Sequence, residues 1–327
     1  MTDEQRQLVR WHLRKAQVAD RLIMGERYRV QRDLVEGVET SGFEDDTEAQ
    51  VWLASNRRNL LALIELAVSR QWNFEAWALA EAMWAYFTSS GTFDEAERCY
   101  RMAAGAAEQD GDTAAQIRMS LLAAQMLTDA RRFDEGEAAL AEIRRTAEEF
   151  GDLVLQGTAL EFTGRLFQKR RLWDEAISWF EDALSNARMQ VRELDDVGPR
   201  VVALQQRFLG QCYLAQGEVA IASRHLENAR QGFAEVGDRR SGLMLEIDAA
   251  LLALRKGSEG AAERVSGALE LARDKGMLQP MADGLVEFAL LTANPRRNEL
   301  LREALKEYES MGDPAAGEVR RLIAEEQ

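Results

Sequence analysis

The sequence is poor in proline, cysteine and histidine, with 4, 2 and 2 of them among 327 residues. Few prolines, beside abundant alanine, leucine, glutamate and arginine, favour helices throughout. Two cysteines far apart and without CxxC spacing, Cys99 and Cys212, make no disulfide framework and fit a reducing cytoplasm. Because the only histidines are His12 and His225, no metal-binding cluster is expected.

Long apolar runs are missing as well. No stretch approaches the roughly 18–20 apolar residues of a transmembrane helix. The polar start MTDEQRQLVRWH lacks the apolar stretch of a secretory signal, and we expect a cytoplasmic protein. The net charge of −15 disfavours binding of nucleic acid or of an anionic membrane by this chain alone.

Motifs for nucleotide or catalytic chemistry are also absent. The sequence has no GxxxxGK[ST] phosphate loop, no GxSxG, no HExxH and no EF-hand spacing. Cys99 and Cys212 each precede a tyrosine at a helix-packing position, so we interpret them as inert helix residues and not as nucleophiles. We therefore expect no enzyme activity, no cofactor and no metal.

What the sequence does have is a recurring pattern of small and large apolar residues. After Trp173, small residues follow at offsets 3 and 10 (Ala176, Ala183) and a large one at offset 7 (Phe180). Such offsets put residues on one stripe of a helix, where small side chains let a second helix approach closely. The pattern predicts stacked pairs of antiparallel helices. Its anchors are Phe93, Phe133, Trp173, Val219 and, in a weaker copy, Glu259.

Glycine–aspartate pairs predict where these helices end and begin. Glycine ends one helix in the left-handed conformation, and aspartate caps the next helix. The pairs are Gly111-Asp112, Gly151-Asp152, Gly237-Asp238 and Gly312-Asp313. Because no stretch shows sustained β-alternation, the expected fold is all-α, a right-handed α-α superhelix of about six long helix pairs. Residues 1–72 are expected to form a helical cap, continuous with a solenoid over 73–327 in one domain.

The best copies, GRLFQKRRLWDEAISWFEDAL (164–184) and GQCYLAQGEVAIASRHLENA (210–229), resemble the tetratricopeptide repeat. Their period of roughly 40 residues exceeds the usual 34, and Gly-Asp replaces the usual closing proline. In these departures, and over 13–30, 49–68 and 76–100, the chain is similar to the repeat region of bacterial signal-transduction ATPases and Streptomyces antibiotic regulatory proteins. The resemblance implies a noncatalytic regulatory module that binds a peptide or protein in a concave groove.

Candidate groove residues follow from the geometry of a helix pair, since the first helix of each pair lines the concave surface. If Gly164 and Phe167 face the second helix, the residues on another stripe of that helix point inward. Arginines with glutamines between them suit a carboxylate or an acidic peptide, although surface arginines are also common without such a role. The predicted groove residues are Arg118, Gln125, Glu161, Arg165, Gln168, Arg207 and Gln211.

Several alternatives stay open. A small-molecule or peptide sensor, whose ligand changes the curvature of the solenoid, is the second function class. Residues 1–32 contain eight basic and four acidic residues, which we interpret as a solvated helix face, with a docking surface as the alternative. The segment 185–200 predicts a longer helix and a protruding loop, with a spacer role.

Overall fold

The computed structural model describes residues 2–193 and 198–325. Over these residues the chain forms helices and connections and contains no strand, which confirms the all-α prediction. The chain divides into two compact units. Unit 1 comprises the residues up to 88 and residues 93–162, and unit 2 comprises residues 89–92 and those from 163 onward. None of the described helices has the length and apolar character that crossing a bilayer requires.

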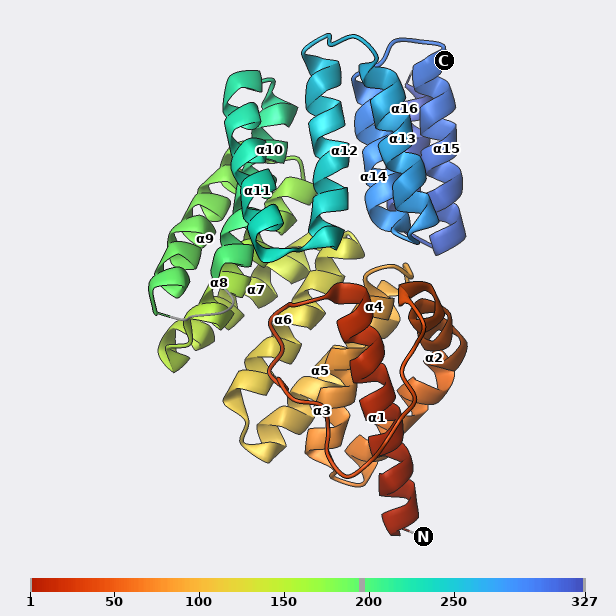
Figure 1. The fold of residues 1–327 in the computed structure, drawn as a ribbon. Coiled ribbons are helices and arrows are strands. Elements are labelled where there is room, and N and C mark those ends of the chain that lie inside the picture. The colour runs from red at the N-terminus through yellow and green to blue at the C-terminus, as the bar shows by residue number, and fades with distance from the viewer. Residues whose placement is uncertain (1, 194–197, 326–327) are drawn as a thin grey trace. The chain divides into compact units, whose positions relative to one another are not determined.

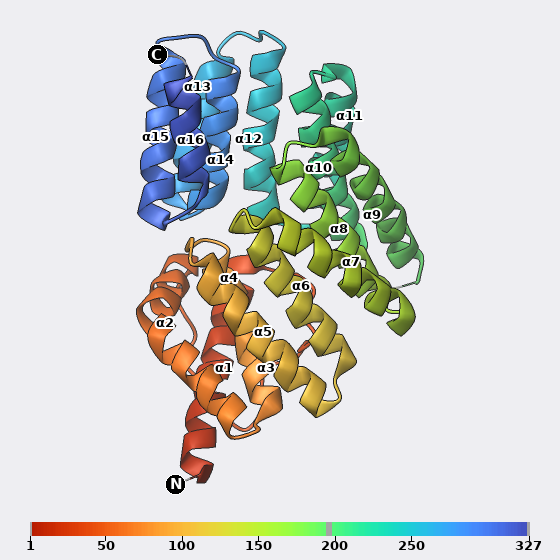
Figure 2. The ribbon, with the colours of Figure 1, turned by 180° about the vertical axis from the view of Figure 1, so that it is seen from behind.

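Unit 1 is built around α5 and the helices before and after it (Figure 2). Helix α3 packs against α1, α2 and α5, and α6 packs between α5 and α7. The core includes Phe87, Tyr100 and Trp84, whose ring stacks on Phe162 at 6.3 Å. The helices of this unit are α1 (Thr2–Met24), α2 (Asp46–Ser69), α3 (Asn73–Ala82), α4 (Trp84–Phe87), α5 (Phe93–Asp110), α6 (Thr113–Asp129), α7 (Phe133–Phe150) and the first part of α8 (Leu153–Lys169).

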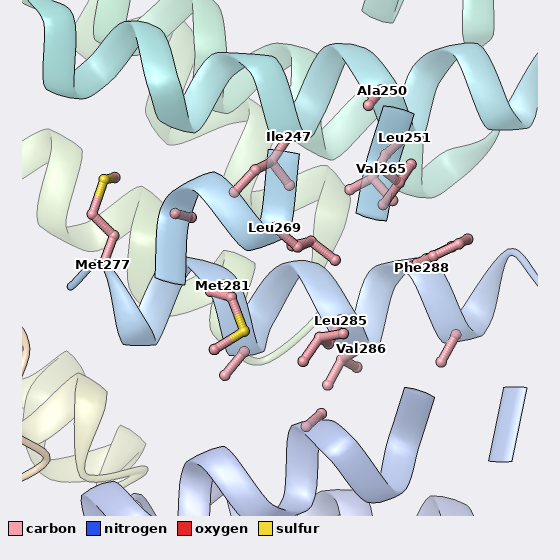
Figure 3. Close-up of a cluster of buried hydrophobic side chains, with 14 of the residues drawn as sticks. Ile247, Ala250, Leu251, Val265, Leu269, Met277, Met281, Leu285, Val286 and Phe288 are labelled. Atoms are coloured by element: carbon pink, nitrogen blue, oxygen red, sulfur yellow. The ribbon is translucent and has the colours of Figure 1, made fainter. Parts of the chain in front are cut away.

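Unit 2 continues from the second part of α8, and from α9 to α16 each helix packs against the next. Figure 3 shows part of its core, where Ile247, Val265, Leu269 and Leu285 from three helices meet. Its further helices are α9 (Trp173–Glu193), α10 (Gly198–Gln216), α11 (Val219–Val236), α12 (Arg239–Arg255), α13 (Ala261–Asp274), α14 (Leu278–Leu290), α15 (Arg296–Met311) and α16 (Ala315–Ala324).

Small residues lie where the helices approach most closely. A Cβ atom on Gly164 would lie 2.7 Å from the Phe180 ring, and one on Gly210 would lie 2.5 Å from Leu226. Ala176 and Ala222 are fully buried. The predicted packing of small against large residues between paired helices is therefore confirmed in these two repeats.

The glycine–aspartate boundaries are confirmed as well. Gly151 and Gly237 end their helices with φ values of 83° and 68°, in the left-handed region. Asp152 accepts a hydrogen bond from the Leu155 amide and Asp238 one from the Ser241 amide, each over 2.9 Å. These carboxylates satisfy amides that have no partner within the helix. Asp112 and Asp313 cap the amides of Ala115 and Ala315 in the same way.

Two expectations about element positions are wrong. In the weak fifth copy, Ala261 and Val265 are buried while Ala262 is exposed, so the packing stripe begins one residue earlier than an anchor at Glu259 implies. The turn before it contains two left-handed glycines, Gly257 and Gly260, which allow α13 to begin at Ala261.

The second concerns the segment 185–200. Helix α9 extends to Glu193 as predicted, but Gly198 and Pro199 open α10 and do not lie in a loop. Proline fits the first turn of a helix because the missing N–H would have no partner there. The remaining residues of the predicted loop, 195–197, lie outside the described residues, as does residue 194 at the predicted end of the helix. The predicted division into a cap (1–72) and a solenoid (73–327) stays a prediction.

Candidate partner-binding surfaces

The predicted groove residues are divided between the two units. Arg118, Gln125 and Glu161 belong to unit 1, and Arg165, Gln168, Arg207 and Gln211 to unit 2. Glu161, Arg165, Gln168 and Gln211 are half-buried. Arg118, Gln125 and Arg207 have exposed fractions of only 5%, 0% and 8%. The expectation that the arginines at 118 and 207 are exposed is therefore wrong, because each is enclosed by acidic partners in its own unit.

In unit 2 the structure brings three predicted residues together. Gln168 of α8 donates a hydrogen bond to the side-chain oxygen of Gln211 over 2.9 Å. Gln211 of α10 in turn donates to Oδ1 of Asp248 over 2.8 Å, and Nε of Arg207 donates to its Oδ2 over 2.5 Å. Helices α8, α10 and α12 are the first helices of successive pairs, so this polar row crosses three repeats.

Asp248 anchors the row and was not among the residues predicted from the sequence. Burial raises the pKa of Asp248, while Arg207 and Gln211 oppose that shift. Because both groups are out of water, removing either one would leave the other as an uncompensated buried charge. The available signal was a lone acid inside the apolar run IDAALL (247–252).

Arg165 is the half-exposed arginine of this surface. Its guanidinium carbon lies 6.0 Å from the ring centre of Phe208, as does that of Arg207. Phe208 is itself stacked on Phe180 at 5.0 Å. An aromatic face attracts a cation at this range, so the packed rings position Arg165 beside the polar row.

In unit 1, Arg118 belongs to a buried charge cluster. Its Nε lies 3.5 Å from a carboxylate oxygen of Glu81, and its guanidinium lies 5.7 Å from the ring centre of Tyr28. Gln125 donates to Asp129 over 3.0 Å. Asp20, Arg27 and Arg29 complete the cluster.

The basic N-terminal residues bind the protein's own backbone. Arg14 and Lys15 donate to the carbonyl groups of Val35 and Ser41, each over 2.7 Å, and Lys15 is only 6% exposed. Val35 and Ser41 lie in the connection between α1 and α2, and Arg10 and Arg21 also donate to carbonyl groups of this connection, those of residues 36 and 32. The interpretation of residues 1–32 as a solvated helix face is therefore wrong for these four side chains. The signal for this arrangement was a run of roughly 20 residues without periodicity between α1 and α2, which is longer than an ordinary loop.

Neither cysteine has the surroundings of a nucleophile. Cys99 and Cys212 are buried and free, and burial raises the pKa of each thiol to about 12. At neutral pH both are protonated and unreactive. Across the residues that the structure describes, no three histidine, cysteine or acidic side chains are grouped so as to hold a metal ion.

Residues 159–194 match the family model of the tetratricopeptide repeat, which confirms the repeat predicted from the sequence. No curated protein matches the chain. A Rap protein complexed with competence and sporulation factor is similar, with 13% identity and a TM-score of 0.57 over 85% of this chain and 74% of that one. Aspartyl phosphate phosphatase F from Bacillus subtilis is also similar, with 13% identity and a TM-score of 0.55 over 85% of this chain and 75% of that one.

A signal-transduction ATPase from Pyrococcus horikoshii with a tetratricopeptide repeat sensor is 17% identical, with a TM-score of 0.48 over 86% of this chain and 44% of that one. At such identities these likenesses concern the fold. The Rap protein and the phosphatase agree with the predicted all-helical repeat fold.

Proposed function

We propose that this chain is a noncatalytic interaction module that binds a peptide or protein partner, in bacterial regulation or signalling in the cytoplasm. The observation that carries the proposal is the polar row of unit 2, in which Gln168 and Gln211 join three successive first helices through Asp248. Repeat proteins bind partners on such surfaces because the stacked helices present side chains at regular intervals.

The chemistry of the row suits a polypeptide with a negative charge. An amide side chain offers both a donor and an acceptor, which is what a peptide group requires. Arg165 is half-exposed beside these amides and can bind a carboxylate through two parallel hydrogen bonds. The Arg207–Asp248 pair lies beneath and fixes the orientation of Gln211.

The proposal assigns different roles to the predicted residues. Arg165, Gln168 and Gln211 contact the partner in unit 2. Half-buried Glu161 stays a predicted groove residue of unit 1. The buried residues Arg118, Gln125 and Arg207 act only through their neighbours.

Affinity capture from the native cytoplasm tests the proposal. The wild type is compared with Arg165→Ala/Gln211→Ala and with the control Arg188→Ala, which removes an exposed arginine on the second helix α9. We expect the wild type and the control to retain the same partner, and the double variant to lose it. Equal capture by all three proteins contradicts the surface assignment.

The noncatalytic part has its own test, because one similar structure is an aspartyl phosphate phosphatase. We expect the protein to release no phosphate from a phosphorylated aspartate in a response-regulator domain beyond the spontaneous rate. Faster release contradicts this part of the proposal and leaves the binding surface to be judged separately.

A second candidate function, small-molecule sensing, is favoured by a hollow of about 660 Å³ in unit 2. Leu254, Ser266, Phe288 and Thr292 contribute to its lining. This volume lies within the roughly 300–1,000 Å³ typical of ligand sites. Thermal shift against a metabolite panel tests it: a shift that Ser266→Trp abolishes supports a sensor, and no shift contradicts it.

A further inference from the structure

The connection between α1 and α2 contains an extended stretch, residues 25–42, called the inter-helix segment below. It contains no helix or strand, and Val35 is its one buried apolar residue. It leaves the end of α1, runs back beside that helix and returns toward α2 (Figure 1). Because so little apolar surface holds it, its position depends on polar contacts.

Side chains of α1 bind the carbonyl groups of this segment. Arg14 donates to the carbonyl oxygen of Val35, and Lys15 donates to that of Ser41, each over 2.7 Å. These are contacts to the main chain, which every residue type offers. They therefore hold an extended backbone whatever its sequence.

Other side chains bind its amides. Glu81 of α3, itself buried, accepts from the amide of Val30 over 3.0 Å and from that of Gln31 over 3.3 Å. Gln17 of α1 accepts from the Val35 amide over 2.9 Å. The groove thus supplies donors and acceptors to one extended chain. Main-chain hydrogen bonds of this kind give affinity in peptide recognition, and pockets for alternate side chains give specificity.

Asp20 provides such a pocket. Its Oδ2 lies 3.0 Å from Nη2 of Arg27 and 2.6 Å from Nε of Arg29, and its side chain is 1% exposed. One carboxylate therefore holds both arginines. Its Oδ1 is buried and has no hydrogen-bond partner among the described residues.

The charge of the groove is complementary to its occupant. Without Arg27 and Arg29 the part of the groove around Asp20 would retain two buried carboxylates, Asp20 and Glu81, and one buried guanidinium, that of Arg118, while buried Lys15 binds the carbonyl group of Ser41. Unpaired buried carboxylates are strongly unfavourable. The vacant groove would therefore select a ligand that brings cationic side chains to Asp20.

We propose that the groove of α1, α3 and α6 in unit 1 is a second peptide-binding site, which the inter-helix segment occupies in cis. In trans it takes an extended peptide with an Arg-x-Arg sequence. The site belongs to unit 1 and shares no residue with the polar row of unit 2, so failure of either proposal leaves the other standing.

Competition within the chain sets the affinity for an added peptide. A tethered segment has an effective concentration in the millimolar range, so the wild type excludes a free peptide of equal intrinsic affinity. A variant whose inter-helix segment binds the groove more weakly should bind the free peptide. The difference in peptide affinity between this variant and the wild type then reports on the site.

Fluorescence polarisation with a labelled peptide of residues 25–42 is the test. We expect Arg27→Ala/Arg29→Ala protein to bind this peptide about tenfold or more tightly than the wild type does, since the cis competitor is lost. A peptide carrying Arg27→Ala and Arg29→Ala does not bind, whereas the matched control peptide with Arg32→Ala does. Equal binding to both proteins, binding to neither, or binding of the peptide without the two arginines overturns the proposal.

If circular dichroism shows that the double variant is unfolded, hydrogen exchange of the wild type tests instead whether the inter-helix segment leaves the groove. We expect the Val30 and Val35 amides to exchange by local opening, faster than the amides inside α6. Exchange of both amides only with global unfolding shows that the segment never leaves the groove and overturns the proposal.

Discussion

Nε of Arg207 lies 2.5 Å from Oδ2 of Asp248, and both side chains are buried in unit 2. This pair joins α10 to α12 and, through Gln211, holds the polar row in place. Two charges removed from water are tolerated in a fold only while each has its partner. The proposed binding surface is therefore tied to the stability of the unit that carries it.

Loss of one partner of this pair is expected to be costly. Arg207→Ala leaves a buried carboxylate unpaired, and we expect it to lower the free energy of unfolding by about 3–5 kcal/mol. The control Arg230→Ala removes an exposed pair with Glu246, for which about 0–1 kcal/mol is expected. Urea denaturation measures both. Similar small losses in the two variants contradict the burial of the pair.

Close helix packing at the repeat alanines is tested by enlarging them. Ala176→Trp and Ala222→Trp each place a large side chain where the structure has no space. Overpacking costs ~1–3 kcal/mol for modest changes, so we expect a loss at or above the top of this range. Ser178→Trp, at an exposed position of the same helix as Ala176, is expected to melt like the wild type. If all three proteins melt alike, the packing register is wrong.

The cap of α12 gives a pH dependence of definite sign. Burial alone raises the pKa of Asp238, but Arg200 and the amide and hydroxyl of Ser241 together lower it below its ordinary 3.8. Below that ordinary value the unfolded chain binds more protons, so this contribution to stability is lost as the pH falls through the folded-state pKa. Asp238→Asn retains a capping oxygen without the charge.

We therefore expect the wild type to be more stable than Asp238→Asn at pH 6, with the difference shrinking as the pH is lowered below about 4. Urea unfolding of both proteins across this range measures it. A difference that grows toward low pH contradicts the assignment.

The two thiols are expected to resist alkylation. Since burial raises the pKa of Cys99 and Cys212 to about 12, iodoacetamide at pH 7.5 should leave both unmodified in the native protein. In urea both should be modified. Mass spectrometry reads the labelling directly, and rapid native modification of either thiol shows that it is accessible.

Local patterns predicted the helices and their boundaries. The spacing around Trp173 and the Gly151-Asp152 pair depend on neighbours within one or two turns, so the sequence alone contains that information. The burial of Arg207 could not be predicted in this way, because Asp248 lies in another helix pair. Residue spacing along a helix predicts the direction of a side chain but not the residue from another helix that covers it.

The same limit applies to unit 1. Basic residues such as Lys15 looked like a solvated face because basic residues outnumber acidic ones eight to four over residues 1–32. Their partners are carbonyl groups of a non-repetitive segment, which carries no periodic signal. The side chains around Asp20 likewise come together only through the tertiary fold.

Site-specific photo-crosslinking tests the central claim, that unit 2 binds its partner along the first helices of its repeats. A photoreactive amino acid replaces Arg165 on α8 in one protein and the exposed Arg188 on α9 in a second. We predict that illumination in the native cytoplasm links a partner through position 165 and not through position 188. Crosslinks from position 188 alone, or equal crosslinks from both positions, would contradict the account.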